Sequence, residues 1–144
     1  MKASDKLGKS RQLKLWTILA QMFITNELGI FHLKQTAQKI VDTIGTSMTI
    51  NEIENVLVNE VGPNFLLNFS PFNTFPEDLG WDEQEVENIM NNVGFIDRTW
   101  RYLVHRNALK NPRIIYRWAA VKTYLMDLGV KENGKGISDY PEDI

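Results

Sequence analysis

Apolar residues recur at intervals of three and four along most of this chain, the spacing that places side chains on one face of an α-helix. The first stripe predicts a helix over residues 10–27, ended by Gly29 in a left-handed conformation. Further stripes predict helices over residues 33–44, 49–61 and 82–93. Strict alternation over a strand length is missing, so the pattern indicates an all-α fold.

Several helix ends carry sequence signals of their own. Thr49 and Glu52 form a T-x-x-E capping box, in which each side chain satisfies an N–H of the first turn. Gly62-Pro63 is expected to end that helix. Asn111-Pro112 combines a cap residue with a proline at the first helical position, and it predicts a last helix that Gly129 caps.

The least regular part of the pattern lies at residues 62–80, which are rich in proline and phenylalanine. We expect a short helical turn at 64–69 there, followed by a packed irregular segment. Another helix is predicted over residues 96–109. The whole chain is then a single domain of about six helices over residues 1–129, with a flexible tail at 130–144.

Composition narrows the classes of function. The chain has 144 residues, of which 43% are hydrophobic and 24% charged, and this fits one compact domain. It has no cysteine and only two histidines, which excludes disulfide scaffolds, thiolate catalysis and three-histidine zinc sites. No nucleophile elbow or phosphate-binding glycine loop occurs. We therefore expect no enzymatic activity, no cofactor and no metal.

The N-terminal region superficially suggests a secretion signal, because a basic stretch precedes the apolar residues 15–24. Thr17 and Gln21 interrupt that run, no small-residue cleavage site follows, and the spacing is helical. No stretch reaches the roughly 18 apolar residues that a membrane span needs. We expect a cytoplasmic protein.

Charge is strongly segregated along the chain. Residues 40–97 carry eleven acidic and no basic residues, whereas residues 98–126 carry seven basic and no acidic residues. Either the two blocks neutralise each other within the fold, or an acidic surface faces a basic partner. The candidate partner-binding residues are the acids of the predicted helices and one aromatic anchor beside them: Glu52, Glu54, Asp78, Trp81, Asp82, Glu83, Glu85 and Glu87.

Three other sequence patterns suggest a metal site, a general base or nucleic-acid binding, and each has an ordinary structural interpretation. Glu83 and Glu87 share a helix face, but no calcium-loop pattern accompanies them, so a solvated face is the interpretation. No HExxH motif occurs, and His32 and His105 are interpreted as surface or partly buried residues and not as general bases. Basic and aromatic residues interleave over 98–122, which suggests nucleic-acid binding, although the pI of about 5.7 argues against it.

The chain resembles a group of small bacterial all-α proteins to which no activity is assigned. The residues that carry the resemblance are Leu15-Trp16-x-x-Leu19-x-x-Met22-Phe23, Ile53-Glu54-x-x-Leu57-x-x-Glu60-Val61-x-Pro63, Leu67-Asn68 and Leu79-Gly80-Trp81. They span about residues 11–93 and are mostly packing and capping residues. The resemblance implies a helical fold and brings no catalytic site.

Size, absence of cysteine, absence of a catalytic motif and the acidic block are also similar to those of bacterial immunity proteins. Proteins of that class bind and neutralise one toxin, often through an acidic surface. This resemblance implies a protein-binding inhibitor whose partner is a basic protein, such as a toxin domain. A nucleic-acid-associated regulator that uses the basic C-terminal helices is the alternative, and a small adaptor subunit is a third hypothesis.

Overall fold

The computed structural model describes residues 2–69, 77–91 and 108–133, and the fold is all-α, as the sequence predicts. The α-helices are α1 (Lys9–Ala20), α2 (Ile30–Ile44), α3 (Ile50–Asn55), α4 (Gly62–Phe65), α5 (Glu83–Asn91) and α7 (Pro112–Asp127). Shorter elements join them: the 3₁₀-helices η1 (Ala3–Leu7), η2 (Gln21–Phe23), η4 (Leu66–Phe69) and η5 (Ala108–Lys110), and the π-helix η3 (Val56–Val61). The expected helix at 96–109 lies almost wholly outside the described residues.

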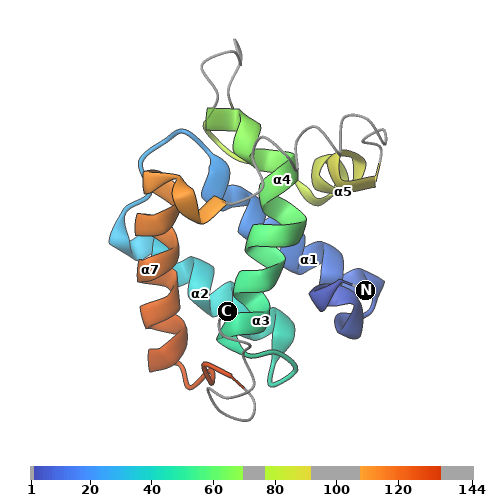
Figure 1. Cartoon of the computed structure of the whole chain (residues 1–144), viewed down its shortest axis with the longest axis vertical. Coiled ribbons are helices and arrows are strands. Elements are labelled where there is room, and N and C mark those ends of the chain that lie inside the picture. The colour runs from blue at the N-terminus through green and yellow to red at the C-terminus, as the bar shows by residue number, and fades with distance from the viewer. Residues whose placement is uncertain (1, 70–76, 92–107, 134–144) are drawn as a thin grey trace.

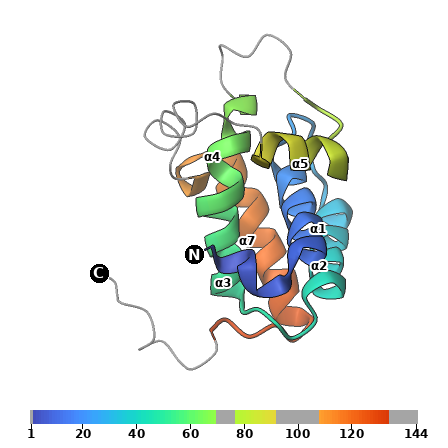
Figure 2. The same ribbon diagram turned by 90° about the vertical axis from the view of Figure 1, so that its right-hand side faces the viewer.

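One core holds these elements together. Helix α1 packs against α2, η3 and α5, while α2 also packs against α7. Elements α3, η3, α4 and η4 form one continuous column, which runs beside α7 in Figures 1 and 2. The predicted stripes are buried: Leu19 and Ala20 of α1, Ile40 of α2 and Ile53 of α3 are all inaccessible to solvent.

The first helix ends earlier than its apolar pattern predicts. Helix α1 passes into η2 and stops at Phe23, and Ile24 is already extended. Gly29 does not form a left-handed cap, because its φ is −73° and it precedes α2 as the N-cap residue. Ile24 is buried although it lies outside the helix, so the apolar stripe continues through a packed loop and overstates the length of the helix.

The third helix continues through the Gly62-Pro63 pair that is expected to end it. Proline normally clashes with the carbonyl four residues earlier and lacks an N–H, but here the backbone is widened to a π-helix before the pair. The N–H of Gly62 donates to the carbonyl of Leu57, five residues back. A Cβ on Gly62 would lie 2.9 Å from that carbonyl oxygen and 3.2 Å from Cβ of Ala108, so glycine permits both the wide turn and the packing of η5.

Two predicted helix starts are confirmed in detail. Thr49 Oγ1 accepts from the N–H of Glu52, and the Glu52 carboxylate accepts from the N–H of Thr49. Asn111 Oδ1 accepts from the N–H groups of Arg113 and Ile114. Gly129 has the predicted positive φ, at 91°. These ends depend on a few adjacent residues, which is why the sequence predicts them well.

The first residues of the predicted C-terminal tail contact the start of α3. The backbone carbonyls of Lys131 and Glu132 accept from the N–H groups of Ile50 and Asn51, 2.8 and 3.0 Å away. They satisfy two donors of the first turn of α3 that have no partner within the helix. Residues 130–133 are therefore part of the fold, and the rest of the expected tail lies outside the described residues. Leu128, which the pattern assigns to the buried stripe, is 44% exposed because the helix ends before it.

Candidate partner-binding surface

The turn that precedes α5 is tied firmly to the rest of the protein. The carbonyl of Glu77 accepts from the N–H of Thr25 and from the side-chain amide of Asn68. The carboxylate of Glu77 accepts from the N–H groups of Leu79 and Gly80, at 3.1 and 3.2 Å. Gly80 has a φ of 118°, and a Cβ there would lie 2.1 Å from Oε1 of Gln21. Any other residue is therefore strained by the positive φ at this turn and displaces the Gln21 amide that binds Trp81.

This turn places Leu79 outside and Trp81 partly inside. Leu79 is 81% exposed. The Trp81 ring packs edge-on against Phe65, with ring centroids 4.8 Å apart, and its backbone N–H and carbonyl both bond to the side chain of Gln21. Trp81, the aromatic anchor that the sequence predicts, is thus partly a core residue. Leu79 is instead the apolar side chain that faces solvent.

Helix α5 begins with a second reciprocal cap. Asp82 Oδ1 accepts from the N–H of Glu85 at 2.8 Å, and Glu85 Oε1 accepts from the N–H of Asp82 at 2.9 Å. Val86 and Met90 turn inward, toward α1 and the column. Helical spacing then places Glu83 and Glu87, four residues apart, on one flank and Glu85 on the other.

Five acids from the turn and from α5 are exposed: Asp78, Asp82, Glu83, Glu85 and Glu87. None of them forms an ion pair with another described residue. We call these five residues the acidic face. Their exposure leaves the carboxylates of Glu83 and Glu87 fully available to a partner, while those of Asp82 and Glu85 also cap the helix.

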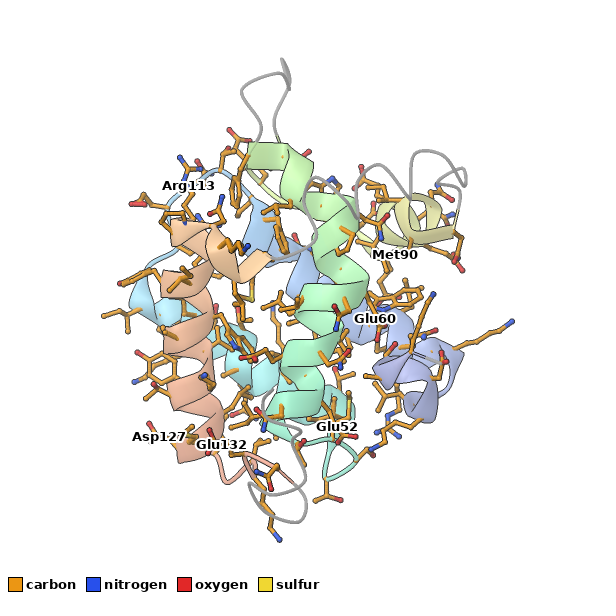
Figure 3. The ribbon with its side chains drawn as sticks, viewed as in Figure 1. Glu52, Glu60, Met90, Arg113, Asp127 and Glu132 are labelled. Carbon is orange, nitrogen blue, oxygen red and sulfur yellow. The ribbon has the colours of Figure 1, made fainter. Side chains whose placement is uncertain are left out.

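The other two predicted acids, Glu52 and Glu54, lie on α3 and have partners within the fold. Glu52 binds Nζ of Lys6 at 2.6 Å. Glu54 accepts from the indole N–H of Trp118 at 2.6 Å and lies 3.8 Å from Nζ of Lys122. In Figure 3, Glu52 lies at the lower end of the column and α5, marked by Met90, at the upper end. The structure does not bring these two acids together with the acidic face, and it shows that the charge blocks neutralise each other in part.

The pKa of Glu52 is lowered by its surroundings. Partial burial by itself raises this pKa, but hydrogen bonds from Lys6 and from the Thr49 amide, together with the charge of Lys6, outweigh burial. A carboxyl whose pKa is depressed on folding stabilises the fold above its unfolded pKa, and this contribution is lost as pH falls through the folded value.

We expect Glu52→Gln to lower the free energy of unfolding at pH 7, by less than about 1 kcal/mol because the pair is partly exposed. The difference from wild type is expected to disappear once the pH falls below the folded pKa of Glu52. Urea unfolding of both proteins between pH 7 and pH 3 measures this. Asp42→Asn, on the exposed surface of α2, is the control. A deficit in Glu52→Gln that is unchanged at the lowest pH would contradict the assignment.

The basic C-terminal block offers fewer free cations than its sequence suggests. Arg117 is only 4% exposed and donates to the carbonyls of Met22 and Ile24 at 2.7 Å. Lys122 lies beside Glu54. Trp118, which the nucleic-acid hypothesis needs as a stacking platform, is 2% exposed. Lys110 and Arg113 are exposed, and residues 98–107, with His105, lie outside the described residues.

Burial lowers the pKa of Arg117, and the charge of Arg113 lowers it further, while Glu27 acts in the opposite sense. Arginine retains its proton through such shifts because its ordinary pKa is so high. Arg117 is therefore a buried cation held by backbone carbonyls, and its role is structural.

Within the described part of the chain, no three histidine, cysteine, aspartate or glutamate side chains gather closely enough to hold a metal ion. His32 is exposed on α2. Among residues 2–69, 77–91 and 108–133, none of the helices has the length and apolar character that a bilayer crossing requires.

Sequence reasoning missed two features. Glu60 is assigned to the acidic block but is 6% exposed, and it accepts from the backbone of Ser4 and the indole of Trp16. Nothing local in the sequence marks it. The outer face of α7 also carries exposed apolar residues, Ile115, Ala119 and Met126, among polar ones, and helical spacing predicts their exposure from the position of the buried stripe.

Comparison with known proteins gives a family and no activity. A protein-family model described as a domain of unknown function (DUF7079) matches residues 10–127. No curated protein and no solved structure matches the chain.

Proposed function

The chain belongs to the DUF7079 family, a domain of unknown function, and from its surface we propose that it binds and neutralises a basic protein partner through the acidic face. One observation carries this proposal: Asp78, Asp82, Glu83, Glu85 and Glu87 are exposed together, without ion pairs inside the described fold. Unpaired acids on one face accelerate association with a positively charged surface and disfavour acidic competitors.

The rigid turn before α5 supports the same proposal. It holds Leu79 outward beside the acids, through bonds from the Glu77 carboxylate to the Leu79 and Gly80 amides. A backbone that is already held in position loses little conformational freedom on binding, which favours affinity. Such an anchor surrounded by charge has the anatomy of an interface hot spot.

The specific form of the proposal is a bacterial immunity protein whose partner is a toxin domain. Size, the absence of cysteine and the acidic face support it. Active sites that cleave nucleic acids are rich in Lys and Arg because they hold phosphates, and an acidic surface blocks such a site by occupying it.

A pair of charge reversals tests the acidic face. We expect Glu83→Lys/Glu87→Lys to weaken partner binding at least about tenfold at low salt and to reduce the salt dependence of affinity. The matched control is Asp42→Lys/Glu132→Lys, which changes net charge equally at exposed sites on α2 and after α7. The tagged proteins are used to capture partners from host lysate, and affinity for the captured partner is measured by titration calorimetry.

The outcomes separate the hypotheses. A partner that is lost only from the α5 variant, and whose toxicity in a naive host is suppressed by wild type, supports the immunity proposal. Equal binding by all three proteins would show that the acidic face is not the binding surface. Captured material that disappears on nuclease treatment would instead favour the nucleic-acid alternative.

A further inference from the structure

Exposed apolar side chains gather on two neighbouring helices. Apart from Leu79, the large hydrophobic residues that stand out in the described part of the chain all lie on α2 or α7, or directly after α7: Ile30, Phe31, Ile115, Tyr116, Met126 and Leu128. Phe31 is 73% exposed and Tyr116 is 62% exposed. Single exposed apolar residues are ordinary, but a contiguous group marks an interaction surface.

Helix α7 carries apolar residues on both sides. Its inner side is the buried stripe that contains Ile114 and Trp118. On its outer side Ile115, Tyr116, Ala119 and Met126 are exposed, with Lys122 and Thr123 as the polar residues between Ala119 and Met126. A surface helix of a monomer normally presents polar residues on this side.

The two ends of the outer side carry opposite charges. Arg113 lies in the first turn and Asp127 is the last residue of α7, and Figure 3 shows them at opposite ends of the helix. Both are exposed and neither forms an ion pair with another described residue. A carboxylate at the C-terminal end of a helix opposes the helix dipole, so Asp127 destabilises the helix unless a cation comes close.

We propose that the outer side of α7 is the interface of a two-fold symmetric dimer, in which α7 packs antiparallel against α7 of a second copy. The helix is self-complementary about Ala119 and Ala120. Antiparallel pairing about that centre brings Ile115 against Met126 of the second copy and Arg113 near its Asp127. Each of these contacts occurs twice, as a two-fold axis requires.

The side-chain sizes fit this arrangement. Ala119 lies where the two helices approach most closely, and a small residue there permits the usual helix separation of about 8–10 Å. Helical spacing places Arg113 and Asp127 on one flank of the outer side and Ile115 and Met126 on the other. In an antiparallel pair each flank meets its own copy, so the charges meet charges and the apolar residues meet apolar residues.

Helix α2 enlarges the interface on the charged flank. Nζ of Lys34 lies 5.6 Å from the ring centre of Tyr124, so the start of α2 borders the outer side of α7. Phe31 lies one turn before Lys34. A covered aromatic side chain contributes about 150–250 Å², and a standard interface takes about 800 Å² from each partner. Phe31 and Tyr116 together supply a large share of that area.

The charge pattern favours a second copy over a different partner. A face with a cation at one end and an anion at the other complements itself, whereas a surface for a basic or acidic partner carries one sign. The dimer also leaves the acidic face free, because the column of α3 and α4 separates α5 from α7 in Figure 1. The inference therefore goes beyond the proposed function and does not depend on it.

Sedimentation velocity of the full chain over about 1–100 µM tests the dimer. We expect wild type to dimerise in this range and Ile115→Lys/Met126→Lys to dimerise at least about tenfold more weakly. Leu79→Lys removes an equally exposed apolar residue elsewhere and is expected to behave as wild type. Circular dichroism checks that each variant is folded. A wild-type protein that stays monomeric throughout, or a dimer that the α7 variant leaves intact, would overturn the proposal.

Two further variants test the antiparallel geometry. Asp127→Arg is expected to weaken the dimer by placing two like charges together, and Arg113→Asp/Asp127→Arg is expected to restore it. Because the natural chain contains no cysteine, Ala119→Cys provides one thiol at the proposed two-fold axis. We expect this variant to form a disulfide-linked dimer under mild oxidation, whereas Asn88→Cys on α5 does not. Failure of Ala119→Cys to cross-link under conditions where wild type dimerises would exclude this geometry.

Discussion

Glu60→Ala is expected to lower the free energy of unfolding by about 2–4 kcal/mol, because it leaves buried donors without an acceptor. The carboxylate of Glu60 accepts from the backbone N–H of Ser4 at 3.1 Å, from the Ser4 hydroxyl, and from the indole N–H of Trp16 at 2.9 Å. Ser4 is inaccessible to solvent and Trp16 is 5% exposed. Water therefore does not reach these donors unless the structure opens.

The network joins three parts of the chain. Ser4 belongs to η1, Trp16 to α1 and Glu60 to the π-helix η3, and Gln12 adds a bond to the Ser4 hydroxyl at 2.8 Å. Loss of the carboxylate thus removes the buried polar link between the N-terminal segment and the column, and leaves the partly exposed pair of Lys6 and Glu52. We expect the N-terminal segment to become more accessible to proteolysis in Glu60→Ala before the whole protein unfolds.

Urea unfolding followed by circular dichroism measures the loss. Glu87→Ala on the exposed side of α5 is the matched control and is expected to stay within about 0.5 kcal/mol of wild type. Trp16→Phe removes the indole donor and keeps most of the ring, so Trp16→Phe and Glu60→Ala form a double-mutant cycle whose coupling energy reports their hydrogen bond. A Glu60→Ala protein as stable as the Glu87→Ala control would show that the network contributes nothing.

The sequence predicts the elements whose ends are decided locally. The boxes of Thr49 with Glu52 and of Asp82 with Glu85 involve residues three apart, and both form. The helix through Gly62-Pro63 depends instead on a wide turn and on η5, which lies far along the chain. The rule that proline ends an α-helix does not take a π-helix into account, so the end of this helix is predicted too early.

The candidate surface was predictable only in part. Exposure of the acids on α5 follows from the apolar stripe of Val86 and Met90, which fixes the buried side. The burial and pairing of Glu54 and Glu60 do not follow from their own segment. Their hydrogen-bond partners are distant in sequence, because Trp118 is 64 residues from Glu54 and Ser4 is 56 residues from Glu60. Contacts of that range are set by the packing of whole helices, so acids that look equivalent in the sequence become exposed, paired or buried.

We expect Arg117→Met to lower the free energy of unfolding by about 3 kcal/mol or more. The guanidinium donates to the carbonyls of Met22, Ile24 and Asn26, at 2.7, 2.7 and 2.8 Å. These carbonyls follow the end of α1, where helix carbonyls lack partners. Methionine fills a similar volume, but it leaves these acceptors without a donor.

Arg117→Lys separates charge from geometry. Lysine keeps the cation but has a single ammonium in place of a planar fork, so it does not reach all three carbonyls. We expect its stability to fall between those of wild type and Arg117→Met.

Arg113→Met is the matched control. The Arg113 guanidinium lies 5.0 Å from the same Phe69 ring that Arg117 approaches to 5.7 Å, but Arg113 is exposed. We expect this control to lose less than about 1 kcal/mol. Amide hydrogen exchange after α1 provides a second measurement, since Arg117→Met should speed exchange at Thr25, which lies in the loop that Arg117 holds and whose N–H donates to the carbonyl of Glu77. Equal stability of the Arg117→Met and Arg113→Met proteins would show that the loop carbonyls find other donors and that the buried arginine does not hold the end of α1.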